Sequence, residues 1–193
     1  MLPSGAYRYE IRRGAEIVAI EEANLDGATI MASRRAADGL NHYEAEVTLD
    51  PDGRVHRVSI RYSSSLFTRK ATYEAAGESF RGSVSALAGR NEIVVGLGRF
   101  REVDVAGLTI FRALIIAHVS ERGQTRWTGR VAVIDPSSLV AASLKQNCAR
   151  RDDSGRRWSY EPRMGDAEEI ELDEAGRILQ RRDNRGLASV LMV

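Results

Sequence analysis

The sequence predicts a mainly β fold in which one large, curled antiparallel sheet, a half-barrel or open barrel, wraps around a single buried helix. Residues 43–49 and 54–62 alternate apolar and polar side chains around an Asp-Pro-Asp-Gly turn, which is typical of a hairpin. Short strand patterns with turn residues between them recur through the first half of the chain. Residues 107–119, in contrast, are almost continuously apolar. We therefore expect one domain over residues 1–193.

The first half of the chain reads as a series of short strands. Glycine, asparagine, aspartate and serine separate them at spacings that favour an antiparallel meander over βαβ units. The predicted strands are 7–11, 17–22, 28–33, 41–49, 54–62, 66–75, 79–87 and 92–96.

The hairpin at 43–62 also predicts which side chains face the core. In its second strand, His56, Val58, Ile60 and Tyr62 fall on the apolar face. Arg57, Ser59 and Arg61 fall on the opposite face, which we expect to be wet.

The apolar stretch 107–119 has two readings. As a helix it would be apolar almost all round, and therefore largely buried, with Gly123 as its C-terminal stop. Its β-branched residues instead favour a strand that turns back at 121–124. Its length and Gly123 lead us to predict the helix.

Beyond the helix, the chain returns to strand patterns at 126–134, 139–148 and 158–160. A last hairpin spans 168–181, and its Leu-Asp-x-x-Gly-Arg-Ile run at 172–178 repeats the turn chemistry of 49–55. Residues 183–193 show no pattern that predicts structure.

Composition excludes several classes of function. A net charge of +1 gives no global field for nucleic acid, and no apolar run reaches the ~20 residues that span a bilayer, so we expect no stable membrane insertion. Cys148 is the single cysteine, so an internal disulfide is excluded. No leader is visible, and we expect a soluble, cytoplasmic protein, or an extracytoplasmic one if a leader has been removed.

No motif predicts a metal site or a nucleotide site. The three histidines, at 42, 56 and 118, do not have the spacing of a local metal motif, and one cysteine offers no thiolate cluster. No glycine-rich phosphate loop follows a strand into a helix. We therefore expect neither a metal nor a cofactor.

Four segments together resemble a known group: the strand Tyr7-x-Tyr9-Glu10-Ile11, the hairpin at 43–62, the buried stretch 107–119 and the hairpin at 168–181. With these, the chain is similar to the LolA/LppX-like bacterial half-barrel proteins, which include a family named for glycolipid binding. The resemblance implies a sheet curled around a hydrophobic cavity that holds lipid or lipid-linked cargo.

Aromatic residues in phase with the buried faces suggest the wall of an amphipathic cavity, because most of them carry hydroxyls that need partners. We expect the protein to bind or carry an apolar small molecule, lipid- or glycolipid-like, between the sheet and 107–119. Concave apolar surface left uncovered could instead form a homodimer contact. The alternative function is a small-molecule isomerase or cyclase using the same cavity, with a histidine or a tyrosine hydroxyl as proton donor. The candidate ligand-binding residues are Tyr9, Tyr43, His56, Tyr62, Tyr73, Phe111, Arg112, His118 and Trp127.

Overall fold

The fold is one 15-stranded sheet with a single α-helix, as seen in a computed structural model that describes residues 2–86, 89–97, 102–163 and 166–192. The helix α1 spans Thr109–Glu121. The strands are β1 (Gly5–Arg13), β2 (Glu16–Asp26), β3 (Thr29–Ala36), β4 (Asn41–Leu49), β5 (Val55–Ser64), β6 (Thr68–Ala76), β7 (Ser79–Ala86), β8 (Gly89–Gly96), β9 (Glu102–Val105), β10 (Arg126–Ile134), β11 (Ala141–Arg150), β12 (Arg157–Pro162), β13 (Glu168–Leu172), β14 (Ile178–Asp183) and β15 (Leu187–Leu191).

The strands follow a meander, as predicted. Their order is β8-β7-β6-β5-β4-β3-β2-β1-β15-β14-β13-β12-β11-β10-β9, so almost every neighbour in space is also a neighbour in sequence. The last strand, β15, pairs with both β1 and β14 and thereby joins the two halves of the chain. Among the described residues, parallel pairing occurs only between β9 and β10.

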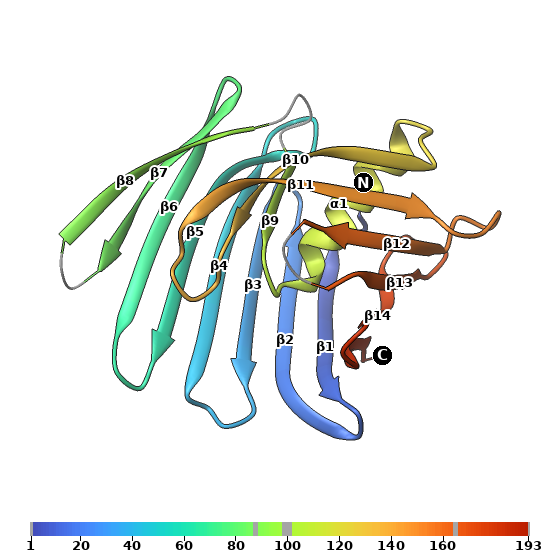
Figure 1. Ribbon diagram of the computed structural model, residues 1–193, viewed down its shortest axis with the longest axis horizontal. Helices are drawn as coiled ribbons and strands as arrows, with labels where there is room; N and C mark the ends of the chain where they lie inside the picture. The colour runs from blue at the N-terminus through green and yellow to red at the C-terminus, as the bar shows by residue number, and fades with distance from the viewer. Residues whose placement is uncertain (1, 87–88, 98–101, 164–165, 193) are drawn as a thin grey trace.

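The predicted buried helix is confirmed. Ten of the thirteen residues of α1 are buried, and Gly123, at φ 66°, adopts the left-handed conformation that ends a helix. The helix lies on the concave side of the sheet, where β10 and β11 also cross in front of the first strands (Figure 1). Strands β10 and β11 form a hairpin, and Tyr73 of β6 is hydrogen-bonded to the turn between them. The Tyr73 hydroxyl donates to the Leu139 carbonyl at 2.7 Å and accepts from the Ala141 N–H at 3.1 Å.

The hairpin register is confirmed for most positions, with one correction. Val58 lies opposite Val47 and is fully buried, and Arg57 is exposed. His56, however, is exposed rather than on the apolar face. The pairing shifts between Thr48 and Leu49 so that Leu49 faces Val55, which makes His56 the extra residue of a bulge and turns its side chain outward.

The two related hairpin turns use the same chemistry, as their sequences predict. The Asp50 side chain accepts the Arg54 N–H at 2.9 Å, and the Asp173 side chain accepts the Arg177 N–H at 2.9 Å. Each turn then closes through a glycine of positive φ.

Two strands were not predicted. The tail from residue 183 forms β15, and residues 102–105 form β9. Both are short, and β9 is buried at all four positions, so neither shows an alternating pattern over enough residues to be recognised. No helix in the described part of the chain is long and apolar enough to cross a membrane.

Candidate functional site

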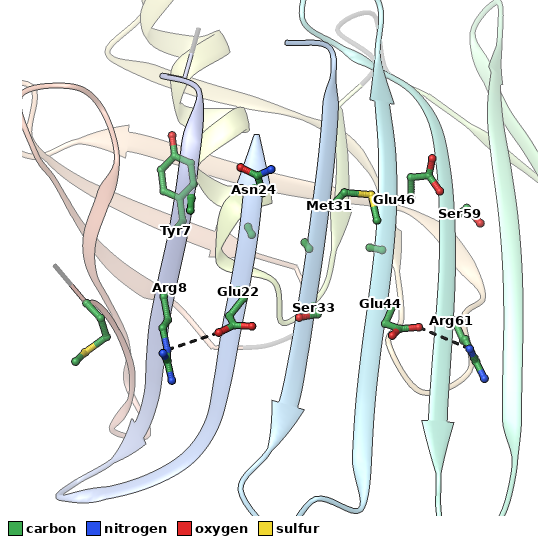
Figure 2. A pocket seen from close by; sticks show the side chains of 15 residues that line it. Tyr7, Arg8, Glu22, Asn24, Met31, Ser33, Glu44, Glu46, Ser59 and Arg61 are labelled. Atoms are coloured by element: carbon green, nitrogen blue, oxygen red, sulfur yellow. Dashed lines mark ion pairs between the residues drawn. The ribbon is translucent and has the colours of Figure 1, made fainter. Parts of the chain in front are cut away.

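A hollow of about 910 Å³ lies on the outward face of the sheet, on the side opposite to α1 (Figure 2). Strands β1 to β5 form its floor, and Met192, just after β15, closes one side. Four strand spacings of ~4.8 Å make it roughly 19 Å across. Its volume is within the range of small-molecule sites, ~300–1,000 Å³.

The hollow is built from two rows of side chains that run across the strands. In each strand, alternate residues face outward, and the pairing register places those of five neighbouring strands side by side. One row is mainly charged and the other is mainly apolar or uncharged. The charged row is Arg8, Glu22, Ser33, Glu44 and Arg61, and the second row is Ala6, Asn24, Met31, Glu46 and Ser59.

The charged row ends in an ion pair on each side. Arg8 and Glu22 approach to 3.7 Å, and Arg61 and Glu44 approach to 3.9 Å, with Ser33 between them (Figure 2). All four charged side chains are more than half exposed. Exposed pairs of this kind contribute at most about 1 kcal/mol, so the groups can exchange partners with a polar ligand.

Two methionines are the large exposed apolar side chains of the hollow, which four alanines also line. Met31 is 51% exposed and Met192 is 43% exposed, although both are large apolar side chains. Methionine is flexible and polarisable, and it adapts to ligands of different shape. The hollow therefore combines an apolar surface with polar groups at both ends.

Three carboxylates and two guanidinium groups line the hollow, which gives it a net charge of −1. A strongly anionic ligand would meet unfavourable electrostatics there. A neutral headgroup rich in hydroxyls could bond to the carboxylates, to the arginines and to Asn24.

The inward face carries a different row, which contains three of the predicted residues. Cross-strand pairing places Arg69, Tyr62, Tyr43, Arg34, Glu21 and Tyr9 next to one another in that order. Tyr43 and Tyr62 stack with ring centroids 5.1 Å apart. Tyr9 is fully buried, and its hydroxyl has no hydrogen-bond partner among the described residues.

Glu21, between Arg34 and Tyr9 in this inward row, binds the first residue of α1. Its carboxylate accepts the Thr109 N–H at 2.6 Å and the Thr109 hydroxyl at 2.8 Å. A carboxylate at this position also interacts favourably with the helix dipole. Burial raises the pKa of Glu21, whereas Arg181, Thr109 and Arg34 oppose that rise.

Arg112 lies in a separate buried cluster. It forms ion pairs with Asp104 and, at 3.1 Å, with Glu168, and its guanidinium stacks 4.3 Å from the centre of the Tyr160 ring. Burial alone would lower the pKa of Arg112, but Asp104, Tyr160 and Glu168 together outweigh it and the pKa is raised. The Arg112 guanidinium, which we expected to bind a ligand, is therefore engaged in contacts within the protein.

His118 is engaged near the other end of α1. Its two ring nitrogens lie 3.0 Å from a Glu102 oxygen and 3.1 Å from the Gly53 carbonyl. Phe111 and Trp127 are buried in the core, and Tyr73 fastens the β10–β11 turn. The predicted residues are therefore distributed over a packed interior, and His56 lies outside it.

Sequence reasoning named Arg112 and His118, but it missed the buried acids Glu21, Glu102 and Asp104, and it missed the outward hollow. A signal for Glu21 was present, because it shares the phase of the buried residues Ala19 and Ala23 in β2. The hollow had no such signal, since it depends on the register of four consecutive pairings. No group of three or more metal-ligating side chains is found in the described part of the chain.

No protein-family model and no curated protein matches the chain. Two solved structures share its fold. A DUF1089 family protein from Pseudomonas aeruginosa is similar with a TM-score of 0.65 and 20% identity, covering 86% of this chain and 89% of its own. A β-barrel-like protein of the domain of unknown function DUF1849 from Brucella abortus covers 100% of this chain and 96% of its own, with a TM-score of 0.57 and 11% identity. At these identities the likeness concerns the fold.

Proposed function

We propose that the protein binds and carries an elongated amphiphile, lipid- or glycolipid-like, in the outward hollow. The observation that carries the proposal is the exposure of Met31 and Met192 in a hollow that the charged row also lines. Met192 lies beside Arg8 at one edge of the hollow and Met31 lies on β3, two strands further across. Exposed apolar side chains on one surface often mark a binding site. The apolar part of the ligand would cover the methionines.

The polar part of the ligand would replace the partners of the two exposed ion pairs. Glu22 and Glu44 can accept hydrogen bonds from hydroxyls, and Arg8 and Arg61 can donate them. Because the charged row contains both positive and negative side chains, it suits a neutral or zwitterionic headgroup better than a polyanion.

The resemblance to the LolA/LppX-like half-barrel proteins supports the class of ligand but implies a different place. Such proteins are expected to hold cargo on the concave face, whereas here α1 and the β10–β11 hairpin fill much of that face. We therefore place the ligand on the outward face.

Titration with fatty alcohols and lysolipids of increasing chain length tests the proposal. Each added methylene that enters the hollow should strengthen binding by ~0.8 kcal/mol, roughly fourfold, until the hollow is full. Ser33→Arg places a bulky charged side chain in the middle of the charged row and should abolish binding. The matched control is Ala142→Arg, at an exposed position of β11. An affinity that does not change with chain length, or an equal loss of affinity in both variants, would overturn the proposal.

No observation favours the isomerase or cyclase alternative. His56 is exposed on a bulge, His118 has both ring nitrogens engaged, and the Tyr73 hydroxyl holds two backbone groups. None of these three lines the outward hollow, and the tyrosine that does, Tyr7, donates its hydroxyl to the Pro3 carbonyl.

A further inference from the structure

The two edges of the sheet differ in how they are protected. At one edge, β9 has four residues, all of them buried. At the other, β8 has eight residues, most of them exposed, and it is the outermost strand in Figure 1. Val94 of β8 is 66% exposed. Long exposed edges can pair with another strand, so proteins usually shorten or cover them.

The backbone groups on the free side of β8 follow from its pairing with β7. The Leu97 N–H donates to the Glu78 carbonyl at 2.8 Å, which makes these two residues a hydrogen-bonded pair. In an antiparallel ladder such pairs alternate, so Arg90, Glu92 and Val94 direct their N–H and C=O groups away from β7. Part of β8 also lies close to β11, but among the described residues β8 is hydrogen-bonded as a strand to β7 alone. Its outward backbone groups are therefore positioned to pair with a further strand.

We propose that β8 of a second copy of this chain fills that position, antiparallel to the first, to form a continuous sheet across a two-fold axis. Side-chain charge selects the register. When Asn91 lies opposite its own copy, Arg90 of each chain faces Glu92 of the other, which gives two favourable cross-strand pairs. Sliding one strand by two residues, which keeps the hydrogen-bonding pattern, places Glu92 opposite Glu92, and this pair is repulsive. Sliding it by two more residues places Glu92 opposite Val94 and removes the charge pairing.

This register makes a precise geometric prediction at Asn91. Asn91 and Val84 form a hydrogen-bonded pair, so the N–H and C=O of Asn91 point toward β7. Across the two-fold axis, Asn91 and its copy therefore form a non-hydrogen-bonded pair. The Cα atoms of such a pair lie ~4.5 Å apart, within the range that a disulfide spans. Its two-fold symmetry makes the contact closed and limits the assembly to a dimer.

Disulfide trapping tests the interface. Asn91→Cys should form a covalent dimer under mild oxidation, detected on a non-reducing gel. The background is low, because burial raises the pKa of Cys148, the native cysteine, to about 12. The matched control is Glu74→Cys, which is exposed on β6, two strands from the edge, and should stay monomeric. Equal trapping of both variants, or of neither, would overturn the proposal.

Charge exchange tests the register independently of cysteine chemistry. Analytical ultracentrifugation should show that Glu92→Arg weakens the dimer at least tenfold, and that the double variant with Arg90→Glu restores it. A parent protein that is monomeric at 100 micromolar, or a dimer indifferent to both substitutions, would overturn the proposal. Binding of an unrelated extended peptide to β8 without self-association would also overturn it.

Discussion

At the residue scale, Arg57 and Val58 show how alternation separates two adjacent side chains. Val58 is fully buried opposite Val47, while Arg57 points outward and lies 3.5 Å from Glu74. This difference was readable from the sequence. The phase of His56 was not, because the bulge that reverses it depends on the turn and not on the strand pattern.

Val58→Asp should severely destabilise the protein. An unpaired carboxylate in a fully buried position costs several kcal/mol, at least about 3. Arg57→Gln, one residue earlier and exposed, should change the free energy of unfolding by no more than about 0.5 kcal/mol. Urea denaturation of both variants measures this, and similar losses in the two would show that the register is shifted.

Gly82 and Gly96, on the neighbouring strands β7 and β8, provide a second contrast. A Cβ at Gly82 would overlap the Thr72 carbonyl oxygen and the Tyr73 ring, whereas one at Gly96 would meet nothing within 4 Å. Gly82→Ala should therefore lower the free energy of unfolding by about 2 kcal/mol or more, and Gly96→Ala should be nearly neutral. Thermal melts compare the two, and an unaffected Gly82→Ala protein would contradict this packing.

At the scale of elements, α1 shows both the strength and the limit of prediction from sequence. Its length, its apolar surface and its stop at Gly123 were readable. Its attachment was not, since Glu21, which receives the first helical N–H groups, is 88 residues away in the chain. Contacts of this kind require the tertiary arrangement to be known.

Glu21 should make stability depend on pH. Its pKa is raised in the folded protein, so between the unfolded value, ~4.3, and the raised native value the folded state binds the extra proton. The contribution of Glu21 is therefore fully present below pH ~4.3 and is lost as pH rises through the native pKa. Urea titrations from pH 4 to 8 should show the parent losing stability relative to Glu21→Gln. A relative gain with rising pH would contradict the assignment.

At the scale of the whole molecule, the sheet and its single helix were predictable, but the hollow was not. Strand patterns repeat along the chain and each can be read locally, whereas the two rows of the hollow exist only when five strands are in register. The aromatic residues that suggested a concave cavity, such as Tyr9 and Tyr73, are fully buried. Met31 and Met192 are instead exposed on the outward face.

Nuclear magnetic resonance of the methionine methyl groups tests the central claim most directly. The protein contains four methionines, and Met31 and Met192 line the hollow. Their signals can be assigned with Met31→Leu and Met192→Leu. Titration with a long-chain lysolipid below its micelle concentration should shift both signals along one saturable binding curve. Saturable binding that leaves these two methyl signals unchanged would contradict the outward site.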